Sequence, residues 1–213
     1  MIVVLIGPPG SGKSTQGHLI SNEYQWPFVG VGDLVREMIH SNNEYESKVN
    51  SGNLLPDEIV FGIVKEELDK MDLSNGLVLE GYPRTTGQAV LLDKYLKQNK
   101  QVLSVVLYLN NVHEQVISDR IAGRYQCPSC GNTYSKEEVP TDFVCSKCGS
   151  KVVPREDDTA SSLLCRMKEY QKKSLPVCAY YNDTNRLCAV DASHSIEEVF
   201  SSARECLKNR REM

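Results

Sequence analysis

Four cysteines have the residue type and the spacing of metal ligands. They form two C-x-x-C pairs, Cys127 with Cys130 and Cys145 with Cys148, and fourteen residues separate the pairs. A glycine follows each pair. Four thiolates at this spacing fill a tetrahedral shell around Zn²⁺. We therefore predict one structural zinc ion per chain, with no open coordination position for chemistry.

The alternative for these cysteines is disulfide bonding, which needs an oxidising compartment. The chain starts with Met1 and the short apolar segment 2–6, without a basic region or a long apolar stretch. We therefore expect no secretory signal and a cytoplasmic location. The remaining cysteines are scattered, and we expect reduced thiols at Cys165, Cys178, Cys188 and Cys206.

A second motif predicts phosphate binding. Residues 7–15 read GPPGSGKST and match G-x-x-x-x-G-K-[ST] at every fixed position. The glycines let backbone N–H groups turn inward around a phosphate, and a following helix adds positive potential. Lys13 is expected to reach the β- and γ-phosphates, and Ser14 or Thr15 to ligate Mg²⁺. A strand-like run before the motif and a helical stretch after it make a chance glycine-rich turn the weaker interpretation.

Six arginines lie near the ends of the expected elements: Arg36, Arg84, Arg120, Arg124, Arg155 and Arg166. A single arginine is most often a solvated surface group. Six of them beside a phosphate loop predict a clamp for a strongly anionic reacting group. Phosphoryl transfer needs such a clamp, because its catalysis is mainly positioning and charge neutralisation.

Short apolar runs alternate with amphipathic stretches, which predicts an α/β fold with a parallel sheet. The expected strands are 2–6, 27–30, 77–80, 103–109 and 187–191. The expected helices are 13–24, 33–40, 44–51, 57–71, 86–98, 112–123, 159–173, 177–184 and 195–209. Capping boxes are predicted at Ser195 with Glu198 and at Thr85 with Gln88. Pro176 is predicted to break the helical stretch around it.

Length and composition exclude several classes of protein. A chain of 213 residues with 40% hydrophobic and 24% charged residues can bury one substantial core. The net charge of −4 argues against nucleic acid as the main partner. No apolar run approaches the ~20 residues that span a bilayer.

Ordered motifs along nearly the whole chain resemble those of the adenylate kinase family, in its bacterial form with a zinc-bearing lid. The matching segments are 7–16, 32–36 (GDLVR), 54–58 (LLPDE), 81–85 (GYPRT) with Gln88, 119–124 (DRIAGR), and 155–158 (REDD) with Arg166.

The resemblance implies a P-loop NTPase-type fold with a five-stranded parallel sheet flanked by helices, divided into three parts. These are a core (1–29, 60–123 and 157–213), a monophosphate-binding flap (30–59) and a zinc lid (124–156). It further implies a monomer that catalyses ATP + AMP ⇌ 2 ADP with Mg²⁺, without nucleic acid or membrane partners.

The same resemblance implies roles for individual residues. The expected ATP-binding residues are Gly10, Ser11, Gly12, Lys13, Ser14, Thr15, Arg120, Arg124, Thr133, Tyr134 and His194. The expected AMP-binding residues are Val31, Arg36, Asn53, Leu54, Leu55, Gly81, Tyr82, Pro83, Arg84, Gln88, Arg155 and Arg166. The expected catalytic residues are Lys13, Arg84, Arg124, Arg155, Asp157, Asp158 and Arg166.

Some positions depart from the family pattern. Val31 stands where threonine is usual, and Glu80 stands where aspartate is usual. The Val31 change keeps a UMP- or CMP-type kinase open as an alternative, while Gln88 favours adenine because its amide pairs with a purine edge. A zinc-ribbon protein that senses nucleotide without turning it over is a further alternative, which the full set of arginines disfavours.

Overall fold

The computed structural model describes residues 1–41, 43–136, 138–155 and 157–211. Glu156, part of the predicted lid exit, and residues 212–213 of the predicted core lie outside them. A five-stranded sheet with the order β2-β3-β1-β4-β8 forms the centre, and all its neighbouring strands are parallel. Its strands are β1 (Ile2–Ile6), β2 (Phe28–Gly30), β3 (Leu77–Glu80), β4 (Leu103–Asn110) and β8 (Leu187–Asp191).

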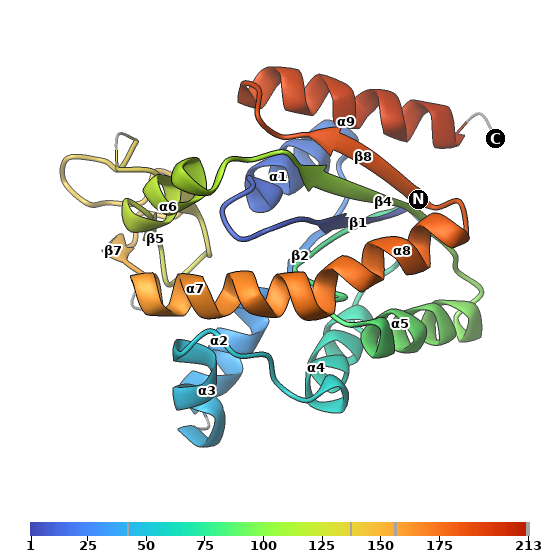
Figure 1. The fold of residues 1–213 in the computed structure, drawn as a ribbon, viewed down its shortest axis with the longest axis horizontal. Helices are drawn as coiled ribbons and strands as arrows, with labels where there is room; N and C mark the ends of the chain where they lie inside the picture. The colour runs from blue at the N-terminus through green and yellow to red at the C-terminus, as the bar shows by residue number, and fades with distance from the viewer. Residues whose placement is uncertain (42, 137, 156, 212–213) are drawn as a thin grey trace.

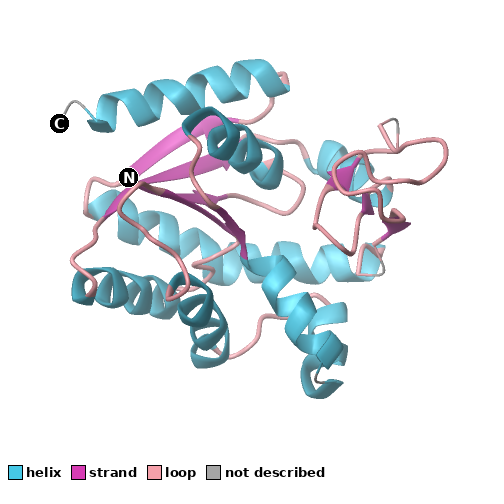
Figure 2. Ribbon diagram, turned by 180° about the vertical axis from the view of Figure 1, so that it is seen from behind, coloured by secondary structure: helices cyan, strands magenta, loops and turns pink. Residues whose placement is uncertain are grey.

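Helices cover both faces of this sheet (Figures 1 and 2). The helices are α1 (Lys13–Tyr24), α2 (Val31–Ser41), α3 (Glu46–Asn50), α4 (Asp57–Leu68), α5 (Thr86–Gln98), α6 (Glu114–Ala122), α7 (Ala160–Glu169), α8 (Leu175–Asp183) and α9 (Ile196–Arg211). In Figure 1, α1 and α9 lie on one side of the sheet, and α4, α5 and α8 lie on the other. The predicted fold class is confirmed.

Two apolar cores explain why the central strand is apolar throughout. All residues of β1 are buried, and successive side chains point to opposite faces of a strand. Ile2, Val4 and Ile6 belong to the core under α4, α5 and α8. Val3 and Leu5 belong to the core under α1 and α9. Burial on both faces therefore removes the polar alternation that a one-sided sheet would show.

The cysteine-bearing segment forms a separate small unit at one end of the molecule. It contains a three-stranded antiparallel sheet, in the order β6-β5-β7, which the sequence analysis did not predict. Its strands are β5 (Tyr125–Gln126), β6 (Thr133–Tyr134) and β7 (Val153–Pro154). Its own apolar cluster is built on Cys127, Tyr134, Cys145 and Val152. Strands of two residues carry too little periodicity to be read from a sequence.

The five predicted central strands are observed with shifts of at most one residue at their ends. Among the helices, the predicted 44–51 is divided into a 3₁₀ turn, Asn43–Tyr45, and the short α3. Helix α4 ends at Leu68 rather than at residue 71. The Ser195–Glu198 capping box forms in both directions, whereas at Thr85 only its hydroxyl caps, accepting from the Gln88 N–H.

The predicted break at Pro176 is wrong. Helices α7 and α8 are joined by a π-helical segment, Tyr170–Ser174, without an interruption. Pro176 lies in the first turn of α8, and the wider π turn before it accommodates the ring and the missing N–H. The continuous helix spans the molecule in Figure 1.

The prediction of four reduced thiols outside the zinc motif is wrong for one pair. Cys188 on β8 and Cys206 on α9 form a disulfide in the structure. Eighteen positions separate them along the chain, so only the packing of α9 on β8 brings them together. Cys165 and Cys178 are free, as expected.

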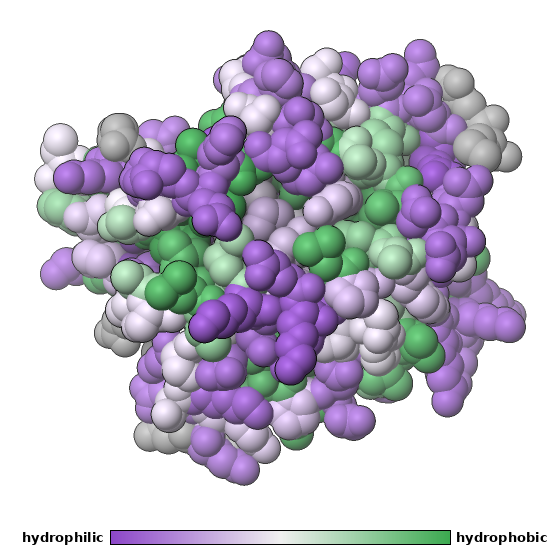
Figure 3. Space-filling view, viewed as in Figure 1, coloured by the Kyte–Doolittle hydropathy of each residue, from purple (hydrophilic) through white to green (hydrophobic). Residues whose placement is uncertain are grey.

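The surface in Figure 3 mixes hydrophobic and hydrophilic groups, and hydrophilic groups interrupt the hydrophobic areas. Within the described ranges, no helix combines the length and the apolar character that crossing a bilayer requires.

The core under α5 gives a direct test of the fold. Leu92 of α5 is completely buried, whereas Val90 on the same helix is 52% exposed. We expect Leu92→Ala to lower the free energy of unfolding by about 2–5 kcal/mol, because it removes buried methyl groups and leaves a cavity. Val90→Ala is the matched control and should change it by less than about 0.5 kcal/mol. Urea denaturation of both variants measures the difference, and equal effects would contradict the described packing.

Candidate active site

The phosphate loop joins β1 to α1 and has the backbone conformation that the sequence motif requires. Gly10 and Gly12 adopt φ values of 73° and 88°, in the left-handed region that residues with a side chain rarely occupy. Gly12 directly precedes the first residue of α1, Lys13. The loop therefore ends on a helix N-terminus, where free N–H groups and the helix dipole favour an anion.

Lys13 lies across this loop. Its Nζ donates hydrogen bonds to the carbonyl oxygens of Gly7, at 3.0 Å, and Pro8, at 2.7 Å. Burial lowers the pKa of Lys13 to about 8, although the nearby carboxylate of Glu80 opposes this shift. An anion in the loop would favour the charged form of the amine. Among the described residues, no carboxylate lies within ion-pair distance of the Lys13 ammonium, and Glu80 acts on it from farther away.

A cavity of about 410 Å³ opens above the loop. Its wall includes the ends of β1 and β3, at Ile6 and Glu80, so it lies at the carboxyl edge of the sheet, where open α/β sheets bind ligands. The wall also includes Lys13 and all six arginines that the sequence analysis singled out, Arg36, Arg84, Arg120, Arg124, Arg155 and Arg166. The structure therefore brings together cations that are separated by up to 153 positions in the chain.

Two aspartates hold three of these arginines. Arg124 donates to both carboxylate oxygens of Asp158, each at 2.7 Å. Arg155 donates in the same two-pronged way to Asp157, at 3.0 and 2.7 Å. Arg166 donates to both aspartates. Such paired bonds fix the direction of the guanidinium plane as well as its position.

The charge of Asp157 depends on this network. Burial disfavours its ionised form, but the hydrogen bond and charge of Arg155, with the charges of Arg166 and Arg36, hold the pKa of Asp157 well below its usual range. Asp157 lies on the cavity wall, whereas Asp158, whose side chain is 3% exposed, does not. Both members of the predicted catalytic pair thus hold and orient the arginines, and Asp157 also faces the cavity.

Arg84 differs from the other buried arginines. Its Nε donates to the carbonyl oxygen of Gly81, and no carboxylate in the described part of the chain lies within 4.0 Å of its charged nitrogens. Burial lowers the pKa of Arg84, Glu80 opposes this, and the charges of Arg166, Arg36 and Arg155 add to the lowering. A guanidinium among like charges would be stabilised by an anion in the cavity.

Part of the cavity wall is less polar. Val31, Leu54, Leu55 and Pro83 line it together with Asn53. Gln88 also reaches the wall and is only 2% exposed. Gly81 lies on the wall, but Tyr82 does not: it is fully buried, and its hydroxyl donates to the carbonyl of Gln88 at 3.2 Å. The peptide bond between Tyr82 and Pro83 is cis.

The expected ATP-side residues meet on the same cavity wall. Arg120 comes from α6, Thr133 and Tyr134 from β6, and His194 from the loop before α9. The Tyr134 hydroxyl is already engaged, because it donates to the sulfur of Cys145 at 3.2 Å. The phosphate-loop residues Gly10, Ser11, Gly12, Ser14 and Thr15 complete this side.

Sequence reasoning missed several residues of the wall. Glu169, Tyr170 and Ser174 belong to α7 and the π-helical segment, and Ser174 Oγ donates to the carbonyl of Arg84 at 3.0 Å. Gln126 of β5 donates to Asp33 of α2 at 2.7 Å. These residues lie in ordinary helical or polar stretches, so no local signal distinguishes them.

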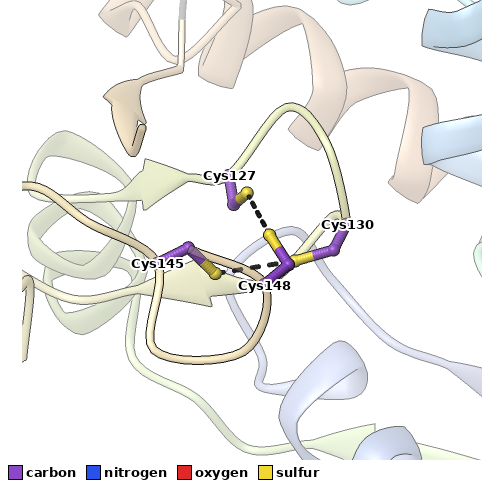
Figure 4. Close-up of side chains that lie close together, drawn as sticks. All are labelled: Cys127, Cys130, Cys145 and Cys148. Atoms are coloured by element: carbon purple, nitrogen blue, oxygen red, sulfur yellow. Dashed lines mark hydrogen bonds between the residues drawn. The ribbon is translucent and has the colours of Figure 1, made fainter. Parts of the chain in front are cut away.

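The four cysteines converge outside the cavity. Figure 4 shows their side chains turned toward a common centre. Cys127 and Cys130 lie in the turn after β5, and Cys145 and Cys148 lie in the turn before Gly149. All four sulfur atoms lie within 4.8 Å of one another, with Cys127 to Cys148 at 3.5 Å and Cys130 to Cys145 at 3.6 Å. Metal–sulfur bonds of about 2.3 Å in a tetrahedron place sulfurs about 3.8 Å apart. The donor set therefore fits a metal ion.

A P-loop at the carboxyl edge of a parallel sheet, facing a cavity lined by arginines, defines the chain as a P-loop nucleotide-binding protein of the phosphoryl-transfer class. The family model for adenylate kinase matches residues 5–186. The chain belongs to the adenylate kinase family.

Relatives cover nearly the whole chain. An adenylate kinase of Caldanaerobacter subterraneus subsp. tengcongensis is 38% identical over 213 residues, which span 97% of this chain and 96% of the relative. One of Clostridium perfringens (strain SM101) is 39% identical, covering 95% and 96%. One of Thermoanaerobacter sp. (strain X514) is 37% identical, covering 99% of each chain.

The aspartate network predicts a pH-dependent loss of stability. Asp157→Asn should lower the free energy of unfolding at pH 7 by about 3 kcal/mol, because it leaves buried arginines without their counter-charge. The pKa of Asp157 is lowered in the folded state, so its contribution is complete above the unfolded pKa of 3.8 and is lost as the pH falls further. The difference in the free energy of unfolding between wild type and variant should therefore become smaller below about pH 4.

Asp183→Asn, at the exposed end of α8, is the control and should unfold like the wild type at both pH values. Chemical denaturation at pH 7 and pH 3.5 measures the two gaps. A gap for Asp157→Asn that stays the same at both pH values would contradict this electrostatic account.

Proposed function

We propose that this chain catalyses the reversible transfer of a phosphoryl group from Mg-ATP to AMP, giving two ADP, as an adenylate kinase. The observation that carries the proposal is the convergence of Lys13 and six arginines on one cavity at the carboxyl edge of the sheet. The phosphates of a nucleoside triphosphate and a monophosphate carry the negative charge that such a set of cations attracts. Membership of the adenylate kinase family points to the same reaction.

The phosphate loop binds the donor in this proposal. N–H groups of residues 10–15 surround its phosphates, and Lys13 leaves the carbonyls of Gly7 and Pro8 to reach the β- and γ-phosphates. Arg120 and Arg124 close over the nucleotide from the α6 side, with Thr133, Tyr134 and the His194 loop beside the base. Since little covalent chemistry is needed, holding donor and acceptor in line supplies most of the rate.

The acceptor binds at the other end of the cavity. Arg36 and Arg84 hold its phosphate, Leu54 and Leu55 contact the base, and Gln88 hydrogen-bonds the base edge. Val31 supplies apolar contact where the family usually has a threonine. Arg155 and Arg166, oriented by Asp157 and Asp158, neutralise the charge that spreads over the phosphoryl group during transfer.

Magnesium accompanies the nucleotide in this proposal and supplies neutralisation of phosphate charge. The oxygen atoms of Ser14, Thr15 and Glu80 line the cavity beside the loop, and Mg²⁺ prefers oxygen ligands. Glu80 replaces the shorter aspartate that is usual in the family, and its longer side chain fits a contact through water.

The cysteine cluster binds one structural Zn²⁺ in this proposal. Cys127, Cys130, Cys145 and Cys148 would fill all four positions, which leaves none for water or substrate. The small core of this segment contains few apolar residues, so metal binding would supply much of the free energy that folds it.

We further propose the three-part division into core (1–29, 60–123 and 157–213), flap (30–59) and lid (124–156). The separate sheet and the separate apolar cluster of the cysteine-bearing segment support it. A monomer is proposed because one chain supplies the whole wall of the cavity. A cytoplasmic location is proposed because four-thiolate metal sites need reduced cysteines, whereas the Cys188–Cys206 disulfide by itself favours an oxidising compartment.

Turnover with ATP and each monophosphate in turn tests the function. We expect ADP formation with AMP and far slower turnover with UMP or CMP. Lys13→Ala should lower kcat by on the order of 10²-fold or more, because its charge is needed where phosphate charge develops, while circular dichroism stays unchanged. If turnover with UMP or CMP is faster than with AMP, that monophosphate is the acceptor instead of AMP. Binding of nucleotides without turnover of any monophosphate would indicate a nucleotide sensor.

Zinc is tested by metal analysis of the purified protein, which should find about one equivalent. Cys145→Ser should lower the melting temperature by at least about 5 °C, because the lost ligand weakens metal binding that is coupled to folding. Cys165→Ser, at a free cysteine of α7, is the matched control and should keep both metal content and melting temperature. Less than half an equivalent of any metal in the wild type would contradict the zinc site.

A further inference from the structure

The side-chain amide of Gln88 is held from both sides in the wall of the cavity. Its Oε1 accepts a hydrogen bond from the backbone N–H of Arg84 at 2.7 Å. Its Nε2 donates to Oδ1 of Asp57 at 3.0 Å. A primary amide offers two acceptor sites and two donor hydrogens. One acceptor site and one hydrogen therefore remain for a ligand.

The two partners allow only one orientation of this amide. A backbone N–H only donates, and an ionised carboxylate only accepts. Turning the amide over would place Nε2 against the N–H of Arg84 and Oε1 against the carboxylate of Asp57. Both hydrogen bonds would be replaced by repulsive contacts at a site that is 2% exposed, where unmade bonds are costly.

The two classes of purine differ in the order of donor and acceptor along the edge that such an amide would bind. A 6-aminopurine presents an acceptor at N1 and a donor at the 6-amino group. A 6-oxopurine presents a donor at N1 and an acceptor at O6. In the observed orientation, the free N–H and the free acceptor site of Gln88 lie side by side and can bind N1 and the 6-amino group of a 6-aminopurine. Binding a 6-oxopurine at the same edge requires the amide N–H and oxygen to exchange places.

We propose that Asp57 is a positioning residue that fixes the amide of Gln88 and so makes the acceptor pocket select 6-aminopurines over 6-oxopurines. The inference rests on the proposed function, because it assumes that a purine monophosphate occupies this side of the cavity. Asp57 does not line the cavity; it lies behind Gln88, in the first turn of α4. It acts through Gln88 and does not touch the base.

The surroundings of Asp57 hold its carboxylate in place. The hydroxyl of Thr85 donates to Oδ2 at 2.7 Å, which leaves Oδ1 for Gln88. Gly87 gives the carboxylate room, because a Cβ at that position would come within 2.5 Å of Oδ2. The same Thr85 hydroxyl accepts from the N–H of Gln88 at 3.0 Å, so the carboxylate and the start of α5 are joined.

The test compares AMP with IMP, which differ only at the N1–C6 edge. We expect Asp57→Asn to narrow the ratio of kcat/KM for AMP over IMP by about tenfold or more, because the carboxylate no longer opposes turning the amide over and only the N–H of Arg84 still does. The KM for ATP should stay unchanged. Glu58→Gln removes the same charge at the next, exposed position and should leave the ratio as in the wild type.

Other outcomes separate the inference from the proposed function. Absence of AMP phosphorylation by the wild type overturns both. Normal AMP turnover with an unchanged AMP-to-IMP ratio in Asp57→Asn overturns the inference alone and leaves Asp57 with a structural role. If that variant does not fold, Gly87→Ala, which displaces the carboxylate without removing its charge, must narrow the ratio, and calorimetric binding of AMP and IMP must show the same change.

Discussion

Repulsion among cations is the constraint on which the rest of the site depends. Arg84 lies among Arg36, Arg155 and Arg166, and no carboxylate of a described residue is within its ion-pair range. Lys13 lies nearby, with a pKa lowered by burial. Asp157 and Asp158 offset part of this charge and orient the arginines. The remaining positive charge is what a phosphate group balances, so the arrangement of these side chains favours anionic ligands.

These cations come from all parts of the molecule. Arg36 lies on α2, Arg124 and Arg155 flank the cysteine-bearing segment, and Arg166 lies on α7. Anionic ligands that contact all of them would draw the proposed flap and the proposed lid against the proposed core. Binding and closure would then have the same physical cause, and a metal in the cysteine cluster would act at a distance by keeping the two flanking arginines in place.

Charge alone does not distinguish one nucleotide from another, because all of them carry phosphates. Discrimination has to come from the uncharged part of the cavity wall, which includes Leu54, Leu55 and Val31 as well as the amide of Gln88. An amide that is free to turn over would form hydrogen bonds with 6-aminopurines and 6-oxopurines alike. The selectivity of such a pocket therefore depends on what stands behind the amide, which here is the carboxylate of Asp57.

The sequence alone determined the phosphate loop, the five central strands and the identity of the arginines, because glycine positions, apolar runs and charge are local properties. Only the tertiary structure decided the rest. It placed Asp157 and Asp158 against the arginines, joined Cys188 to Cys206, let the helix continue through Pro176, and set Asp57 against Gln88. Two of these contacts, Asp57 to Gln88 and Cys188 to Cys206, join residues that are 31 and 18 positions apart, and packing rather than local pattern determines which such residues meet.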